Sequence, residues 1–117
     1  MKYKDILKAP LAYWNLDPKE KKDIVNGVGP FGWGWLFPET IWGLRITEAA
    51  NAHDYSYHVG LNMADKAVAD TDFKNNMIAI IKYQKSWKWL ENLRIHRAKL
   101  MYVAVDKFGD SAFKNKG

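Results

Sequence analysis

The sequence contains no cysteine. Disulfide bonds and thiolate metal sites are therefore excluded, and nothing in the composition requires an oxidising compartment. Long hydrophobic runs are also absent, because the longest apolar stretches, residues 33–38 and 77–81, are far shorter than the roughly 20 residues that span a bilayer. The first residues lack the apolar core of a secretion signal. We therefore expect a cytoplasmic or virion-associated protein that is at most peripheral to a membrane.

Several familiar functional motifs are missing as well. The sequence has no phosphate-binding Gly-Lys-Ser/Thr loop, no Gly-x-Ser-x-Gly nucleophile turn and no His-Glu-x-x-His zinc helix. The 18 Lys and Arg residues against 13 Asp and Glu give a net charge of +5, which favours a polyanionic partner such as nucleic acid or an anionic lipid surface. Helix-turn-helix, zinc-finger and RNA-binding signatures are absent, and basic charge without such a motif supports only nonspecific binding. No specific nucleic acid is therefore expected, and the pattern indicates no oligomeric state.

What is present fits one small helical domain. The chain has 117 residues, is 48% hydrophobic and includes six Trp, six Tyr and five Phe, which provides the bulky apolar content of a single packed core spanning residues 1–117. Helical spacing dominates, with no internal repeat and no convincing two-residue alternation. The predicted class is all-α, although a β-wing two residues wide remains open.

The predicted helices follow from capping residues and apolar spacing. A short helix begins at Asp17-Pro18 and ends at Asn26-Gly27, before the only Gly-rich segment of the chain, residues 27–34. Residues 39–46 are ambiguous. Three longer helices are predicted: 46–58, ended by Gly60; 64 to about 89; and 90–107, after a bend near Glu91-Asn92 and closed by Gly109. The expected architecture has two long antiparallel helices that carry the functional site, preceded by the Gly-rich loop, plus a short N-terminal and a C-terminal helix.

Two polar residues fall on the apolar faces of these helices. His53 shares a face with Ile46, Ala49, Ala50 and Tyr57, and Asp70 shares a face with Phe73, Met77, Ile80 and Ile81. A buried carboxylate and a buried imidazole both need partners, so the sequence predicts that they pair. In such a pair the carboxylate fixes the tautomer, and the imidazole can act as a general base near neutral pH. The alternative is that His53 is a satisfied core residue and that Asp70, like Asp72, is a cap or a solvated charge.

Asp54 lies about 100° around the helix from His53, on the side of Asn51 and His58. It need not join the His53–Asp70 pair and is available for another task. A hard cation takes oxygen ligands, which Asp54 and the backbone carbonyls of the loop 27–34 could supply, because glycines let backbone oxygens converge. The sequence therefore favours calcium as the cation and a calcium-type loop before the helices.

These residues bear a resemblance to a known family. His53-Asp54-Tyr55-Ser56-Tyr57 fits the His-Asp-x-x-Tyr core of phospholipase A2 enzymes, and Ala69-Asp70-Thr71-Asp72-Phe73 resembles the corresponding segment of the disulfide-free parvoviral and prokaryotic types. The resemblance covers roughly residues 27–77. It implies hydrolysis of the sn-2 ester of glycerophospholipids, with His53 as the base for a water, Asp70 as its partner, Tyr57 hydrogen-bonded to Asp70, and Asp54 as a calcium ligand. The small, cysteine-free chain would suit a phage or bacterial source.

The Gly-rich loop departs from the family pattern, which is an aromatic-x-Gly-x-Gly segment. Two stretches compete for that register, Pro30-Phe31-Gly32-Trp33-Gly34 and Val25-Asn26-Gly27-Val28-Gly29. The first lies nearer to His53, and the resemblance then implies Pro30, Gly32 and Gly34 as the carbonyl ligands of calcium. A few extra residues still separate that stretch from His53.

Aromatic and basic residues surround these motifs. Trp33, Trp35, Leu36, Phe37 and Trp42 follow the Gly-rich loop closely, where they could form a rim at the headgroup boundary of a membrane or simply cover the core. Six Lys and Arg residues alternate with Trp87 and Trp89 along the predicted C-terminal helices: Lys82, Lys85, Lys88, Arg94, Arg97 and Lys99. They could face anionic lipid or nucleic acid, or could form ordinary solvated faces.

Two functions are compatible with these patterns. The first is a calcium-dependent phospholipase A2-like ester hydrolase that acts at a phospholipid membrane surface. The second is a non-enzymatic binding module that keeps the helical scaffold and recognises a membrane, a protein or a nucleic acid through its basic, aromatic-rich surface. The complete set His53, Asp54, Tyr57 and Asp70 favours the enzyme, whereas the irregular loop register favours the module.

Overall fold

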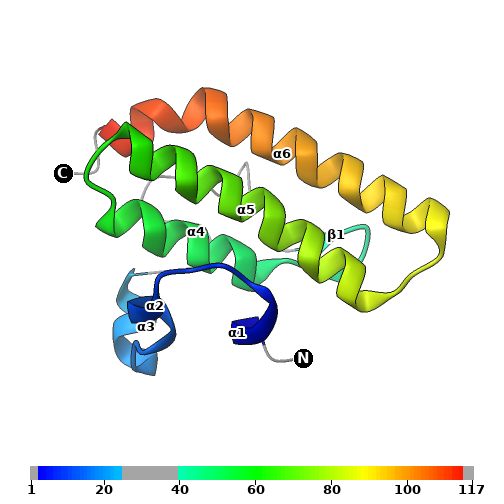
Figure 1. Ribbon diagram of the computed structural model, residues 1–117, viewed down its shortest axis with the longest axis horizontal. Helices are drawn as coiled ribbons and strands as arrows, with labels where there is room; N and C mark the ends of the chain where they lie inside the picture. The colour runs from blue at the N-terminus through cyan, green and yellow to red at the C-terminus, as the bar shows by residue number, and fades with distance from the viewer. Residues whose placement is uncertain (1–2, 25–39, 115–117) are drawn as a thin grey trace.

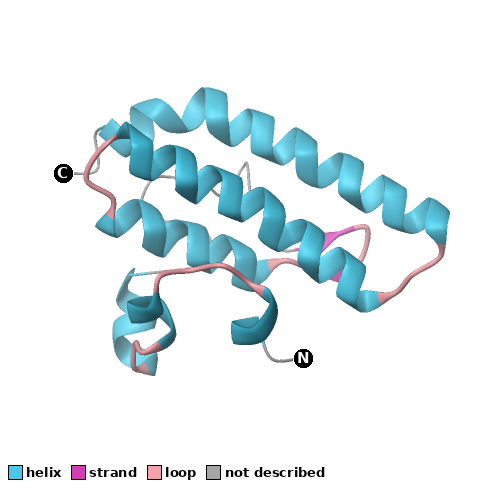
Figure 2. Cartoon of the chain, viewed as in Figure 1, coloured by secondary structure: helices cyan, strands magenta, loops and turns pink. Residues whose placement is uncertain are grey.

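The described residues fold into helices with one very small β-hairpin. The computed structural model describes residues 3–24 and 40–114, with side chains described for 3–21 and 40–107. Within these ranges the elements, in chain order, are α1 (Tyr3–Ile6), α2 (Leu11–Trp14), α3 (Pro18–Ile24), β1 (Thr40–Ile41), β2 (Leu44–Arg45), α4 (Thr47–Val59), α5 (Met63–Gln84) and α6 (Lys88–Lys114). The predicted all-α class is confirmed (Figure 2).

The three long helices lie side by side, and each runs antiparallel to the next in the order α4, α5, α6 (Figure 1). The helices α1 and α3 contact α5 and α4, respectively. Within residues 3–24 and 40–114, none of the helices combines the length and the apolar character needed to cross a bilayer.

The helix α4 and the turn after it are held by local caps. The backbone N–H of Gly60 donates to the carbonyl of Ser56 at 3.0 Å and closes α4, so the predicted stop at Gly60 is confirmed. In the turn, the Asn62 side chain accepts from the Asp65 N–H at 2.9 Å, while the Asp65 carboxylate accepts from the Leu61 N–H at 2.8 Å. These two bonds resemble a capping box and fix the short connection between α4 and α5.

The boundary between α5 and α6 differs from the prediction. The helix α5 ends at Gln84 instead of near residue 89, and Lys85 follows with a left-handed φ of 50°. The predicted bend near Glu91-Asn92 is wrong, because α6 is already helical from Lys88. A left-handed residue ends a helix sharply, and the chain reverses there so that α6 can pack along α5. The same apolar spacing continues on both sides of the break, so periodicity does not reveal it.

Two further boundaries depart from expectation. Gly109 does not close the last helix, which continues to Lys114, since a single glycine inside a helix costs only about 1 kcal/mol. The four-residue helices α1 and α2 were not predicted, because they are too short to show a period. The predicted cap at Asp17 is confirmed by a 2.8 Å bond from the Glu20 N–H. The predicted stop of that helix at Asn26-Gly27 lies outside the described residues.

The ambiguous segment 39–46 contains the small β-wing that the sequence left open. Thr40 pairs with Arg45 and Ile41 pairs with Leu44 in an antiparallel ladder. The two turn residues, Trp42 and Gly43, both have positive φ, 47° and 82°, as two-residue hairpins of the primed type require. The guanidinium of Arg94 on α6 donates to the Trp42 carbonyl at 2.8 Å and ties this hairpin to the helices.

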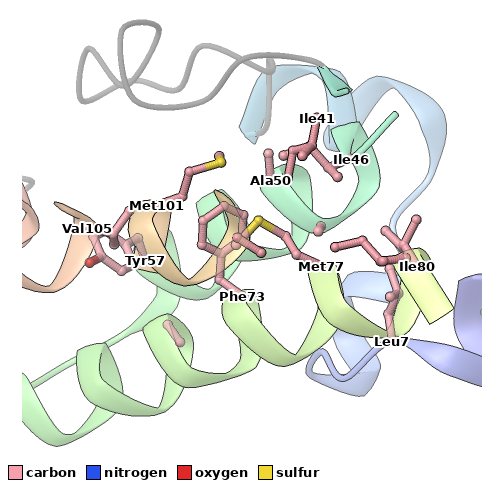
Figure 3. Packing of buried hydrophobic residues seen from close by; sticks show 14 residues of the cluster. Leu7, Ile41, Ile46, Ala50, Tyr57, Phe73, Met77, Ile80, Met101 and Val105 are labelled. Atoms are coloured by element: carbon pink, nitrogen blue, oxygen red, sulfur yellow. The ribbon is translucent and has the colours of Figure 1, made fainter. Parts of the chain in front are cut away.

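The core lies where α4, α5 and α6 meet the hairpin and the N-terminal segment (Figure 3). Every residue predicted for the inward faces of α4 and α5 is buried. From the other elements the same cluster takes Leu7, Ile41, Ala98, Met101 and Val105. The N-terminal segment is fastened by Asn76, whose amide accepts from the Lys8 N–H at 2.7 Å and donates to the Lys8 carbonyl at 2.8 Å.

Candidate active site

The predicted contact between His53 and Asp70 is present. The Nε2 atom of His53, in the middle of α4, lies 2.8 Å from Oδ1 of Asp70 on α5, and the two side chains are 0% and 1% exposed. The two helices place these residues opposite each other because each stands on the apolar face that its own helix turns toward the core. The pair therefore confirms the inference from the two helical faces.

Tyr57 completes the network as the resemblance implies. Its hydroxyl donates to the same Oδ1 of Asp70 at 2.6 Å. The His53 ring packs between aromatic neighbours, with centroid distances of 4.2 Å to Tyr57 and 4.9 Å to Phe73. Hydrogen bonding and packing together hold the imidazole in one orientation.

Lys66 is a member of the network that sequence reasoning missed. Its ammonium donates to Oδ2 of Asp70 at 2.5 Å, and it lies 3.4 Å from the backbone carbonyl of Asp106 on α6. The residue is only 2% exposed. The available signal was its position four residues before Asp70, on the same inward face as Phe73, but lysines on helices usually keep their charge in water. Asp70 thus accepts from three side chains on two helices.

The charges in this network shift the pKa values of both partners. Burial acts to raise the pKa of Asp70, but the hydrogen bonds from His53, Lys66 and Tyr57 outweigh it, so the pKa is lowered and Asp70 stays ionised. For His53, burial is the largest influence and lowers the pKa. The Asp70 carboxylate opposes that effect, and the charge of Lys66 adds to it. The ground state is therefore a neutral imidazole beside an anionic carboxylate, which is the protonation state that a general base requires.

Asp54 is buried in a different way. It is 0% exposed, and neither carboxylate oxygen has a hydrogen-bond partner among the described residues. Burial alone raises its pKa from 3.8 to about 7. The negative charge also reaches Tyr13, whose pKa is raised by burial, by its hydrogen bond to Glu48 and by the fields of Glu48 and Asp54. An unpartnered buried carboxylate is costly, so Asp54 is the described group that most needs a cation.

The other predicted site residues are distributed as follows. The proposed carbonyl ligands Pro30, Gly32 and Gly34, and the proposed rim residues Trp33, Trp35 and Phe37, lie outside the described residues. Trp42, the remaining rim residue, lies in the hairpin turn and is 60% exposed. Among residues 3–21 and 40–107, whose side chains the structure describes, no group of three or more His, Asp or Glu side chains could hold a metal ion. Because Pro30, Gly32 and Gly34 lie outside the described residues, Asp54 is the one predicted calcium ligand whose surroundings the structure describes.

The described site combines the fixed His53–Asp70 pair with the carboxylate of Asp54, the next residue of α4, which has no hydrogen-bond partner in the described part of the chain. The pair can accept and stabilise a proton, and the separate carboxylate can bind a hard cation. Neither the models of known protein families, nor the curated proteins, nor the solved structures include a match to this chain.

Proposed function

We propose that the protein is a calcium-dependent hydrolase of the phospholipase A2 kind, which cleaves the sn-2 ester of glycerophospholipids at a membrane surface. One observation carries this proposal: the buried His53–Asp70 pair stands directly beside Asp54, a buried carboxylate without a hydrogen-bond partner among the described residues. A core with a purely structural role could contain the His53–Asp70 pair, because each side chain compensates the burial of the other. Burial of the Asp54 carboxylate costs free energy unless the carboxylate binds a cation or another partner.

In the proposed reaction His53 is the general base. Asp70 holds Nε2 at 2.8 Å, so Nδ1 is the nitrogen that takes a proton from the water attacking the ester carbonyl. The Asp70 carboxylate then stabilises the imidazolium, and Tyr57 keeps that carboxylate in place. Since water itself attacks, no covalent intermediate forms. Lys66 balances the charge of Asp70 in the resting state.

Asp54 would hold the calcium ion, together with the carbonyls of Pro30, Gly32 and Gly34 that the resemblance implies. The two carboxylate oxygens of Asp54, which have no hydrogen-bond partner among the described residues, fit that role, because calcium prefers carboxylate oxygens. When bound, calcium would polarise the ester carbonyl and stabilise the developing oxyanion.

The test is release of free fatty acid from phospholipid vesicles labelled in the sn-2 chain, measured with calcium and then with chelator. We expect calcium-dependent release that falls by 10²–10⁴-fold in His53→Gln, the range that positioned acid–base catalysis supplies. His58→Gln and His96→Gln are matched controls, and both should retain activity because neither residue has a hydrogen bond to a carboxylate among the described contacts. Activity of His53→Gln within about tenfold of the unmodified protein would refute the assignment.

A second candidate is the non-enzymatic binding module. The burial of His53, whose side chain is 0% exposed, favours it, since a base must reach its substrate. The same assay separates the two functions: no fatty acid released at any calcium concentration, with the fold intact by circular dichroism, supports the module and rejects the enzyme.

A further inference from the structure

The outer face of α6 carries a row of exposed apolar residues. Trp89, Leu93, Leu100 and Val103 are 58%, 39%, 48% and 45% exposed. With His96 they follow a spacing of four, three, four and three residues, so they form one continuous stripe along the helix. The stripe extends for about 21 Å at 1.5 Å per residue.

This stripe is separate from the face that α6 turns to the core. Ala98, Met101 and Val105 are buried against the rest of the protein, and Leu100 stands about 160° around the helix from Ala98. The helix is thus apolar on two nearly opposite sides. Single exposed apolar residues are common on protein surfaces, but a contiguous row marks an interaction site.

Positive charge flanks the row. Lys88, Arg97, Lys99 and Lys107 are exposed along the same helix. The acidic residues nearby are Asp106, which is exposed, and Glu91, which lies 4.0 Å from Lys88. At the start of the helix Trp87 is 74% exposed, and its ring centroid lies 6.1 Å from that of Trp89. The face therefore combines an apolar stripe, two exposed indole rings and a net positive border.

The apolar stripe and its basic border favour some binding partners of the outer face of α6 over others. A second copy of the chain would bring two positively charged borders together, which disfavours self-association. An anionic bilayer instead attracts the basic border, takes the apolar stripe into its interface and accommodates Trp at the headgroup level. In Figure 1, α6 lies at the outer edge of the three-helix layer, and the exposed side chains of the stripe run along the helix from Trp89 to Val103.

We propose that the outer face of α6 binds an anionic phospholipid bilayer, with the helix lying in the membrane plane. The choice of lipid as the partner rests on the proposed function. The binding itself requires neither His53 nor calcium, because the stripe and its basic border lie outside the site.

The experiment is flotation of the His53→Gln protein with vesicles of phosphatidylglycerol and phosphatidylcholine, in chelator, so that neither hydrolysis nor a metal contributes. We expect binding to mixed vesicles that weakens with added salt, and little binding to pure phosphatidylcholine. Arg97→Glu should weaken binding at least about fivefold, as loss of one basic contact with an anionic surface does. Leu100→Glu should weaken it by at least as much, because it removes an apolar side chain from the stripe and adds a negative charge. Two matched controls lie at exposed positions elsewhere and should bind normally: Leu61→Glu makes the same substitution as Leu100→Glu, and Lys19→Glu reverses one positive charge as Arg97→Glu does.

Three results would overturn the proposal. They are equal binding to neutral and anionic vesicles, equal weakening by the control variants, or a dimer in solution that Leu100→Glu dissociates, which would assign the face to a second copy. Failure of the proposed function is distinguishable, because it would remove fatty-acid release and leave this binding unchanged. Conversely, Leu100→Glu should leave hydrolysis of a dispersed, short-chain phospholipid unaffected.

Discussion

The Asp70 carboxylate accepts hydrogen bonds from three side chains. His53 and Tyr57 contact one oxygen and Lys66 contacts the other. A buried ion pair such as Lys66–Asp70 adds little net stability, because its desolvation offsets the attraction, but removing one partner typically costs about 3–5 kcal/mol. Any change at Asp70 therefore alters both the site and the fold, and a test of its role must separate the two.

Asp70→Asn should lower hydrolysis more than tenfold and lower the pKa of His53 further, because the carboxylate that supports the imidazolium is gone. NMR titration of His53 measures the second effect. The double variant Lys66→Met/Asp70→Asn also removes the buried ammonium that has lost its ion-pair partner Asp70, and should recover part of the lost stability. Asp72→Asn, two residues away, is the matched control. A His53 pKa that is unchanged in both Asp70 variants would mean that the observed contact has no electrostatic role.

Asp54→Asn should stabilise the calcium-free protein at alkaline pH. Because the folded-state pKa of Asp54 lies above 3.8, at about 7, the folded protein binds this proton more tightly than the unfolded chain does. Stability that is present below pH 3.8 is therefore lost as the pH rises through about 7, a loss on the order of 4 kcal/mol. Urea unfolding in chelator should show a larger gain for Asp54→Asn at pH 8 than at pH 5. An equal gain at both pH values would contradict the buried, ionised state.

At the scale of elements, the N-terminal segment depends on one side chain of α5. Asn76 is 2% exposed and reproduces a backbone-like pair of hydrogen bonds with Lys8. Leu7, the residue before Lys8, belongs to the main core. The two hydrogen bonds from Asn76 therefore hold the N-terminal segment, whose helices are only four residues long, against α5.

Asn76→Leu should cost about 2–4 kcal/mol of unfolding free energy, because it leaves two backbone groups of Lys8 without partners. The Lys8 amide should also lose its protection in hydrogen exchange, while the amides in the middle of α5 keep theirs. Asn75→Leu, an exposed neighbour on the same helix, is the control and should change stability by less than about 0.5 kcal/mol. Retained protection of the Lys8 amide in Asn76→Leu would show that apolar packing alone holds the segment.

At the scale of the whole molecule, the proposed calcium site couples metal binding to folding. A ligand that binds only the folded state stabilises it by about 2.7 kcal/mol at a hundred times its dissociation constant. Calcium should therefore raise the thermal midpoint of the protein, and Asp54→Asn should abolish that increase. His58→Gln serves as the control and should respond to calcium as the unmodified protein does. If calcium leaves the midpoint unchanged at millimolar concentration, the carboxylate does not bind the metal.

The sequence alone determined the helical class, the inward faces of α4 and α5, and the meeting of His53 with Asp70. These features depend on local periodicity and on one general cost, that of burying a polar group without a partner. The cap at Asp17 is equally local, because it is one hydrogen bond from the Glu20 N–H to the Asp17 side chain. The stop at Gly60 also falls where the sequence placed it, although Gly60 has an extended conformation with φ −66° that any residue can adopt.

Only the tertiary structure decided that Lys66 is buried, that α5 ends at Gln84 and that Asn76 binds Lys8. Each of these depends on which side chains and backbone groups meet across elements far apart in the chain. The same apolar spacing is compatible with one long helix or with two that fold back on each other, and the packing of α6 on α5 selects the second. The burial of Lys66 and Asn76 cannot be predicted from their neighbours in the sequence, because the hydrogen-bond partners that compensate their desolvation come from other elements or depend on the packing of the helices.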